Sequence, residues 1–284
     1  MKTTAAKYDP ELRGASYDIF RVRSANAPEE LLHHHDFYEI IYIVSGNVSY
    51  SIESSSFSPS SGDFVLISPF ELHLPISTPS GIPYELIVLR MTPAFMEAIS
   101  GGEGSLSGCF NHSGRSKVNL LRSSGRLAPI MSGLMECILK ENETEDFGNQ
   151  QLAKAAITHL LVLANRLSVQ AGEDGKADMS LASRVLAYIG EHYADDITLD
   201  LLAKEFFVSK YHLSHEFSKT VGTSVYRYLI KKRLMIAKQL MTMGDTPVKV
   251  CQKCGFGDYA NFYRAFRNEY QVSPKEYVTF TKRI

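Results

Sequence analysis

The spacing of hydrophobic and polar positions predicts short strands in the first third of the chain. Residues 15 to about 95 contain β-rich runs such as YEIIYIVSGNVSYSI, GDFVLISP and YELIVLRM, with Pro and Gly between them. Several short strands at this spacing predict a small barrel or sandwich. Turn residues at Ser45-Gly46-Asn47 separate two β-rich segments, so we expect a hairpin there.

The period changes to that of helices after a Gly/Ser-rich stretch at about 100 to 120. Apolar residues then recur three and four positions apart, first from Leu127 to Ile138 and again from Leu152 to Leu167. Residues 171–180, AGEDGKADMS, are polar, and the chain from Leu181 onward has a helical pattern. We therefore expect an N-terminal domain at 1–170, a linker at 171–180 and a C-terminal domain at 181–284.

The segment ITLDLLAKEFFVSKYHLSHEFSKTVG predicts a helix, a short turn and a second helix. Thr198 can cap the first helix and Ser209 the second, because both hydroxyls can accept a backbone N–H. The second helix would bury Leu213 and Phe217, which stand four residues apart. The apolar stripe of the first helix consists of Leu199, Leu202, Ala203 and Phe206. Together these features predict a helix-turn-helix.

The same arrangement recurs about 50 residues later, in TPVKVCQKCGFGDYANFYRAFRNEYQVSP. A short helix is expected at roughly Val248 to Cys254, followed by a Gly255-Phe256-Gly257 turn and a cap at Asp258. Phe262 and Phe266 then take the places of Leu213 and Phe217. The stretch between the copies, SVYRYLIKKRLMIAKQLMTMG, predicts a helix that holds the two copies at a fixed separation.

These segments resemble the C-terminal region of the AraC/XylS family of transcription regulators, from about Val185 to Tyr277 without a gap. The family's recurring residues are met by Arg233, Ala237, Gly255, Phe256, Phe266 and Pro274. Cys251 and Cys254 stand where the family usually has aliphatic residues, and Gln271 stands where it commonly has Gly. The resemblance implies an all-α, seven-helix domain that binds double-stranded DNA with two helix-turn-helix units.

A recognition helix places the N-terminal part of its exposed face against base edges in the major groove. By position, the expected base-facing residues are Tyr211, Ser214 and His215 in the first helix and Tyr259, Ala260, Tyr263 and Arg264 in the second. Arg264 is the strongest candidate, because its guanidinium can contact guanine in a bidentate way. Phosphate contacts are expected from Lys210, Lys219, Arg267 and Lys275.

The N-terminal half carries the spacing H-x-H-x3-E-x6-G at His33, His35, Glu39 and Gly46. The later segment GDFVLISPFELH adds His73 and is similar to a second cupin motif. The resemblance is to the cupin-like sensor domain that precedes many AraC-type DNA-binding domains, and it covers about residues 18 to 95. His33, His35 and Glu39 share one strand face by parity, so we expect them to line an effector pocket with His73.

Three interpretations of these four residues stay open on the sequence alone. Imidazoles and a carboxylate can hold Fe, Mn, Ni or Zn, which would suit a metal-dependent cupin enzyme carrying an accessory DNA-binding module. They also suit a metal-free pocket that binds a small polar effector, or a purely structural role. We favour the metal-free effector pocket, with no cofactor, no metal and no catalytic residue. The C-x-x-C pair at Cys251 and Cys254 is interpreted as buried, since zinc needs four ligands.

Composition indicates a polyanion-binding region at the C-terminal end, and by itself it leaves nucleic acid and an anionic membrane both open. The net charge is −1 over 284 residues, but residues from Ser180 onward hold 16 Lys and Arg against 10 Asp and Glu. That part carries +6 and the remainder −7. A basic domain joined to an acidic one indicates that only one of them meets a polyanion. Four irregularly spaced cysteines do not suggest a disulfide framework.

We therefore expect an α+β regulator: a cupin-like β-barrel with trailing helices, a linker and a double helix-turn-helix domain. A polar N-terminus and the lack of a run of about 18 apolar residues predict a cytoplasmic protein that does not meet the membrane. The trailing helices are expected to cover the open side of the barrel, and in this family such helices often pair two subunits. A homodimer is therefore expected, and RNA polymerase stays open as a further partner.

Overall fold

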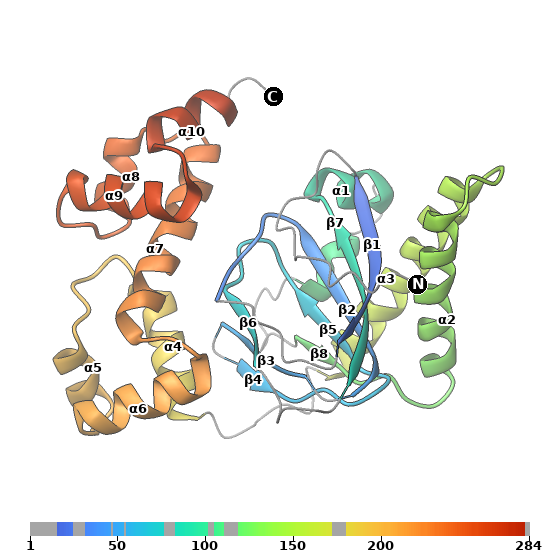
Figure 1. The fold of residues 1–284 in the computed structure, drawn as a ribbon, viewed down its shortest axis with the longest axis horizontal. Coiled ribbons are helices and arrows are strands. Elements are labelled where there is room, and N and C mark those ends of the chain that lie inside the picture. The colour runs from blue at the N-terminus through green and yellow to red at the C-terminus, as the bar shows by residue number, and fades with distance from the viewer. Residues whose placement is uncertain are drawn as a thin grey trace. The chain divides into compact units, whose positions relative to one another are not determined.

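The computed structural model describes residues 16–24, 32–46, 48–53, 55–76, 83–101, 105–110, 119–171 and 180–281. The chain divides into two compact domains, and the helices from α4 onward belong to the second (Figure 1). The first is the N-terminal domain and the second the C-terminal domain. Residues 172–179 of the expected linker lie outside the described residues.

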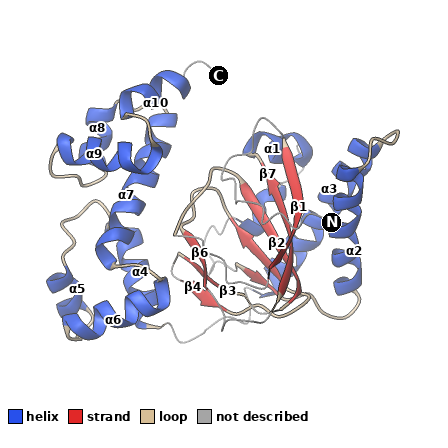
Figure 2. Cartoon of the chain, viewed as in Figure 1, coloured by secondary structure: helices blue, strands red, loops and turns tan. Residues whose placement is uncertain are grey.

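The N-terminal domain contains a five-stranded antiparallel sheet in the order β1-β7-β2-β5-β8, whose strands are labelled in Figure 1 and drawn in red in Figure 2. Its strands are β1 (Tyr17–Ser24), β7 (Tyr84–Met91), β2 (Tyr38–Ser45), β5 (Phe64–Ile67) and β8 (Leu120–Leu121). The strands alternate between two buried faces, because successive side chains point to opposite sides of a sheet. Ile40 and Leu89 face the helices, whereas Ile41 and Val88 face a second sheet.

The second sheet has three strands in the order β4-β3-β6, namely β4 (Ser55–Phe57), β3 (Ser49–Ile52) and β6 (His73–Ile76). Tyr50 and Ile52 of β3 pack in one core with Ile43 of β2, so the two sheets meet face to face. This is the expected small β-structure, with the predicted strands at β2, β5 and β7 confirmed.

The predicted hairpin at Ser45-Gly46-Asn47 is wrong. β2 pairs with β5 and β7, whereas β3 pairs with β4 and β6, so the chain crosses between sheets at this point. Gly46 has φ +85°, and a Cβ there would lie 2.6 Å from the carbonyl oxygen of Pro83. The glycine therefore permits a close backbone approach as well as a turn, and local sequence does not distinguish the two uses.

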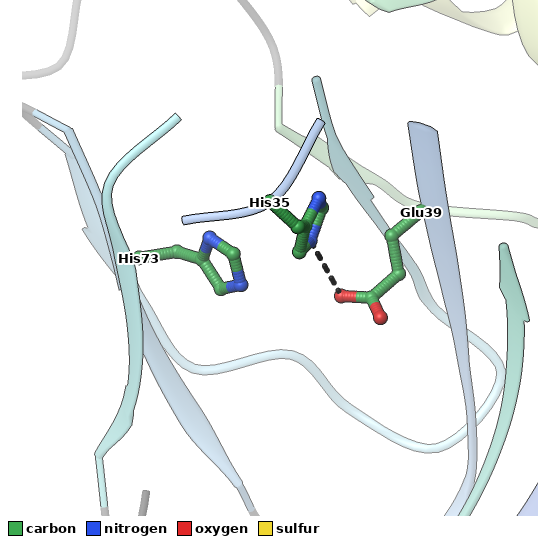
Figure 3. Close-up of side chains that lie close together, drawn as sticks. All are labelled: His35, Glu39 and His73. Carbon is green, nitrogen blue, oxygen red and sulfur yellow. Dashed lines mark ion pairs between the residues drawn. The ribbon is translucent and has the colours of Figure 1, made fainter. Parts of the chain in front are cut away.

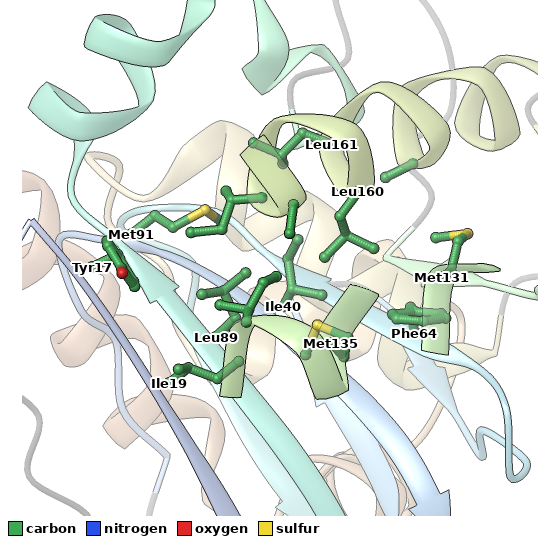
Figure 4. Packing of buried hydrophobic residues seen from close by; sticks show 14 of the residues in the cluster. Tyr17, Ile19, Ile40, Phe64, Leu89, Met91, Met131, Met135, Leu160 and Leu161 are labelled. Atoms are coloured by element: carbon green, nitrogen blue, oxygen red, sulfur yellow. The ribbon is translucent and has the colours of Figure 1, made fainter. Parts of the chain in front are cut away.

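The trailing helices cover the outer face of the five-stranded sheet. They are α1 (Pro93–Ser100), the 3-10 turn η1 (Leu106–Phe110), α2 (Leu127–Glu143) and α3 (Asn149–Ala171). Met131, Met135, Leu160 and Leu161 of α2 and α3 pack against sheet residues such as Ile40 (Figure 4). The expectation that these helices close an open side of the barrel is corrected accordingly. They instead bury much of one face of the sheet, in which β2, β5 and β7 carry apolar residues on both sides.

One helix among the described residues, Asn149–Gln170, is long and apolar enough to count as a candidate membrane span by length and composition. The apolar side chains of this helix include Ile157, Leu160 and Leu161, which are fully buried against the sheet. Packing in the core thus accounts for much of its apolar character.

The described part of the C-terminal domain holds seven helices, α4 to α10, as the resemblance implies. They are α4 (Leu181–His192), α5 (Leu199–Glu205), α6 (Lys210–Val221), α7 (Val225–Thr242), α8 (Pro247–Lys253), α9 (Tyr259–Tyr270) and α10 (Pro274–Thr281). Helix α7 is the predicted spacer, and α9 and α10 pack with α7 and α8 in one core.

Candidate functional site

Two helix-turn-helix units, α5–α6 and α8–α9, form the candidate DNA interface. The recognition helices α6 and α9 each contain 12 residues. Ser209 Oγ accepts the His212 N–H at 3.1 Å, and Asp258 Oδ1 accepts the Asn261 N–H at 2.7 Å, so both predicted caps are confirmed. Leu213 and Phe217 in α6, and Phe262 and Phe266 in α9, form the buried faces that the sequence predicts.

The turns before the two recognition helices share a backbone pattern but differ in side chain. Phe207 donates its N–H to the Lys204 carbonyl, and Gly255 donates to the Gln252 carbonyl, each three residues back. Both residues are left-handed, with φ 56° at Phe207 and 73° at Gly255. Phe207 is 94% exposed. A Cβ on Gly255 would lie 2.3 Å from the carbonyl oxygen of Ala194, in the loop that follows α4.

Arg233 of α7 links the loop that follows α4 to the turn of the second helix-turn-helix unit. Its Nε donates to the Tyr193 carbonyl and its Nη2 to the Asp195 carbonyl, both at 2.7 Å, at the end of α4. Its guanidinium also lies 5.9 Å from the ring centroid of Phe256, in the turn of the second unit. Arg233 is only 9% exposed, so these contacts are buried and stabilise a fixed joint between that loop and the second unit.

The residues predicted to read bases in the first unit lie on the solvent face of α6. Tyr211 is 80% exposed and its ring stacks near that of His215, with centroids 6.1 Å apart. A shallow hollow on this face is lined by Tyr211, Ser214, His215, Ser218 and Lys219. Sequence reasoning missed Ser218, which stands one turn beyond Ser214 on the same face. Lys210 is exposed and forms an ion pair with Asp200 at 2.8 Å.

Helix α9 presents its own predicted set, with Tyr259, Ala260 and Arg264 exposed and Tyr263 half-buried. Arg267 is exposed one turn later, and so is the predicted phosphate contact Lys275 in α10. Arg264 donates through Nη2 to the side-chain oxygen of Asn261 at 2.6 Å. Asn261 was not singled out from the sequence, although its place three residues before Arg264 puts both on one helix face.

Gln271 ends α9 in the way that a glycine would. Its φ is 60°, the same left-handed region that Gly222 occupies at the end of α6 with φ 72°. The Gln271 N–H donates to the Arg267 carbonyl at 2.9 Å, so the helix end is closed despite the departure from the family pattern.

In the N-terminal domain, three of the four predicted effector residues lie together. His35, Glu39 and His73 are all buried, and their ligand atoms lie within 4.8 Å of one another (Figure 3). Glu39 Oε2 lies 3.5 Å from His35 Nε2. His33 is not part of this group, although it has the same parity as His35, and both residues precede strand β2, which begins at Tyr38.

Arg90 completes what we call the buried polar cluster: His35, Glu39, His73 and Arg90. Its Nε donates to Glu39 Oε1 at 3.0 Å, and the two residues face each other across the β2–β7 pairing. Arg90 also lies over the rings of Phe20 and Phe37. Sequence reasoning missed it, although it is the sole charged residue on the inward parity of YELIVLRM, which it shares with Leu86 and Val88.

Backbone carbonyls fix both imidazoles of the cluster. His35 Nδ1 donates to the Phe37 carbonyl at 2.9 Å and His73 Nδ1 to the Glu71 carbonyl at 2.8 Å, since a carbonyl can only accept. Burial alone would raise the pKa of Glu39, but the hydrogen bond and charge of His35, with the charges of Arg90 and His73, hold it well below its usual value. Glu39 is therefore a carboxylate at neutral pH.

The cluster has the donor types for either of two ligand classes. His35, Glu39 and His73 could hold a divalent transition metal, with the Nδ1 contacts orienting each ring. Arg90 already supplies Glu39 with a cationic partner, however, so the carboxylate does not need a metal to offset its burial. The same polar groups can hydrogen-bond a small polar molecule.

The C-x-x-C pair lies in the core of the C-terminal domain. Cys251 and Cys254 are buried, and burial raises the pKa of both thiols, to about 12 for Cys254. Neither is a thiolate at neutral pH, so they act as small apolar residues.

Comparison with known proteins agrees with both halves of this description. Residues 20–161 match the AraC-like ligand binding domain, and residues 202–279 match a helix-turn-helix domain. The chain is 26% identical to the HTH-type transcriptional activator RhaS of Salmonella schwarzengrund over 261 residues, which covers 90% of this chain and 89% of that protein. The Escherichia coli O1:K1 RhaS is 25% identical with the same coverage.

A structural relative is fatty acid-bound ToxT from Vibrio cholerae. It is 14% identical, with a TM-score of 0.40, over 93% of this chain and 95% of that one.

Proposed function

This chain belongs to the AraC family of DNA-binding transcription regulators with an N-terminal ligand-binding domain, and we propose that it activates transcription from an asymmetric DNA site. The observation that carries this proposal is the repeated, capped recognition helix with different exposed residues in each copy. His215 in α6 and Arg264 in α9 hold equivalent positions, six residues after their caps. Each helix would therefore read a different short sequence. Activation is proposed because the RhaS relatives are named as activators.

Base reading is assigned to the exposed faces near the helix N-termini. These residues are Tyr211, Ser214 and His215 in α6 and Tyr259, Ala260, Tyr263 and Arg264 in α9. Phosphate contacts are assigned to Lys210, Lys219, Arg267 and Lys275. The spacer helix α7 has 18 residues and is about 27 Å long, which favours recognition helices in successive major-groove segments of one DNA face.

Two substitutions separate these roles. Arg264→Ala should cost about 1–3 kcal/mol at the cognate site and relax preference at one base pair. Lys219→Ala should instead weaken binding to all sequences alike and reduce the slope of the salt dependence by about one unit. Affinities for cognate and random duplexes across a salt series measure both. Equal losses on the two duplexes for Arg264→Ala would contradict the base-reading role.

We propose that the effector binds at the buried polar cluster of the N-terminal domain. A ligand that reached this cluster would exchange hydrogen bonds with a fixed carboxylate and two fixed imidazoles. To change DNA binding, it must have different affinities for two arrangements of the protein.

Other proposals accompany this one: a cytoplasmic location, contact with RNA polymerase, and a homodimer. Exposed apolar residues on α2 and α3, namely Ile130, Leu152 and Val169, support pairing through these helices.

The effector proposal is tested by titrating small polar metabolites while operator affinity is measured. Wild type is compared with Glu39→Gln combined with His73→Ala. We expect an active metabolite to shift wild-type affinity but not that of the double variant. A His33→Ala variant is the matched control, because His33 lies outside the cluster, and it should respond as wild type. A double variant that responds as wild type does would place the effector elsewhere.

A further inference from the structure

Arg264 does not stand alone on the exposed face of α9, because a chain of hydrogen bonds runs to it from the helix cap. Asp258 Oδ1 accepts the Asn261 backbone N–H at 2.7 Å, and Asp258 Oδ2 accepts the Asn261 side-chain amide. The Asn261 oxygen in turn accepts from Arg264 Nη2 at 2.6 Å. The Arg264 Nε also lies 3.4 Å from the Ala260 carbonyl.

Chemistry alone fixes the direction of this chain. A carboxylate only accepts and a guanidinium only donates, so the Asn261 amide must turn its NH2 to Asp258 and its oxygen to Arg264. Asp258 therefore both caps the start of the helix and sets the orientation of the Asn261 amide. One hydrogen of Nη2 is used in this contact, which leaves its second hydrogen and the two hydrogens of Nη1 for other acceptors. Two adjacent N–H groups are what a bidentate contact to guanine requires.

We propose that Asn261 is a specificity-determining residue that positions Arg264, with Asp258 holding Asn261 in turn. This inference rests on the proposed base-reading role of Arg264. A long side chain loses rotamer freedom when it is held against a base, and a residue that fixes it beforehand reduces that loss. Positioning also restricts which base pair the guanidinium can reach. Asn261 thus acts on the same base pair as Arg264, and through it.

The first unit provides a comparison within the same chain. His212 holds the position of Asn261 in α6, three residues after the cap Ser209. Serine has a single side-chain oxygen, which the His212 backbone N–H uses. The second oxygen of Asp258 is therefore what the second unit adds. Asp258→Ser should keep a cap of the kind that α6 already has and release the Asn261 amide.

The test uses the full chain and a site selected from random duplexes, with affinities for every single base-pair change in that site. We expect Asn261→Ala to weaken cognate binding about fivefold and to relax preference at the base pair that Arg264→Ala relaxes. In the Arg264→Ala background, Asn261→Ala should add no further loss. Asp258→Ser should relax the same base pair by about two- to threefold without lowering the unfolding midpoint. His212→Ala is the control and should leave that base pair unaffected.

Three outcomes would overturn the proposal: additive losses in the double variant, relaxation at a different base pair, and wild-type selectivity for Asn261→Ala. The first two would mean that Asn261 reads a base itself or acts through the fold. A failure of the base-reading role is recognised separately, because Arg264→Ala alone would then weaken all duplexes alike.

Discussion

The two helix-turn-helix units start their turns with the same backbone contact but have different residues there, and the second turn is one residue longer. Phe207 in the first unit and Gly255 in the second make the same hydrogen bond to a carbonyl three residues back, in the same left-handed conformation. Phe207 projects into solvent, whereas the Gly255 Cα faces the backbone of Ala194. The comparison separates two reasons for a glycine, its tolerance of positive φ and its lack of a Cβ. The first unit adopts the positive φ without a glycine, whereas the second unit requires a residue that has no Cβ.

The largest effect is expected where the glycine is required for space. Gly255→Ala would place a Cβ 2.3 Å from the Ala194 oxygen, and neither backbone can give way without moving α4 or α8. We expect a loss of more than about 3 kcal/mol in the free energy of unfolding of the C-terminal domain. Urea unfolding of the full chain, followed by circular dichroism, measures it. A loss below about 1 kcal/mol would mean that this close approach is not a feature of the folded protein.

Substitution of Arg233 is expected to have the next largest effect. Arg233 binds the loop that follows α4, which Gly255 allows to lie against the turn of the second unit. Arg233→Met keeps the aliphatic stem but leaves the Tyr193 and Asp195 carbonyls without their charged donor. We expect a loss of about 2–4 kcal/mol in stability. We also expect weaker preference for one spacing between the two halves of the DNA site. Affinities for duplexes with one base pair inserted or removed between the halves measure this, and unchanged discrimination would contradict a fixed joint.

Phe207→Gly should act in the opposite direction and more weakly. Glycine relieves the left-handed strain of a bulky residue, and part of this gain is offset by the greater freedom of glycine in the unfolded chain. We expect a gain of about 0.5–1 kcal/mol in the free energy of unfolding. Phe207→Ala is the control, since it removes the ring but keeps the strain, and it should change stability little. A loss of stability in the glycine variant would indicate that the Phe207 ring makes a stabilising contact.

The smallest effect is expected at the C-terminal ends of the recognition helices. Here the first unit has the glycine and the second unit does not. Gly222 ends α6 and Gln271 ends α9, both left-handed. Gln271→Gly should stabilise the C-terminal domain by about 0.5 kcal/mol, because the strain it relieves slightly exceeds the loss of the contact from Gln271 Nε2 to the Asn268 carbonyl at 2.9 Å. Thermal unfolding detects this as a small rise in midpoint. A fall would show that this side-chain contact matters more than the backbone conformation.

The elements that sequence predicts well are those with local causes. The caps at Thr198, Ser209 and Asp258 and the apolar faces of α6 and α9 all follow from neighbours within four residues along the chain. The hairpin at Gly46 was wrong because strand pairing depends on segments far apart in sequence, here β5 and β7. The sequence also does not predict the left-handed conformation of Phe207, because bulky residues rarely adopt it.

The same distinction between local and long-range causes applies to the residues of the candidate sites. His35, Glu39 and His73 were recognised from motif spacing, whereas Arg90 was missed, because only the register of β2 and β7 brings it to Glu39. Asn261 was missed for a different reason. Its spacing from Arg264 was visible, but an asparagine on an exposed helix face is common and gives no signal by itself.

The pairing of Glu39 with Arg90 also has a consequence for how the sheet assembles. β2 and β7 are apolar on both faces, so a slip by two residues would keep every hydrophobic side chain on a buried face. Such a slip would set Glu39 opposite Val88 and Arg90 opposite Phe37, which would break the buried Glu39–Arg90 ion pair. An unpaired buried charge costs about 3–5 kcal/mol, so the ion pair selects one alignment among several that hydrophobic burial would accept. The buried Glu39–Arg90 pair thus specifies the register in which β2 and β7 pair.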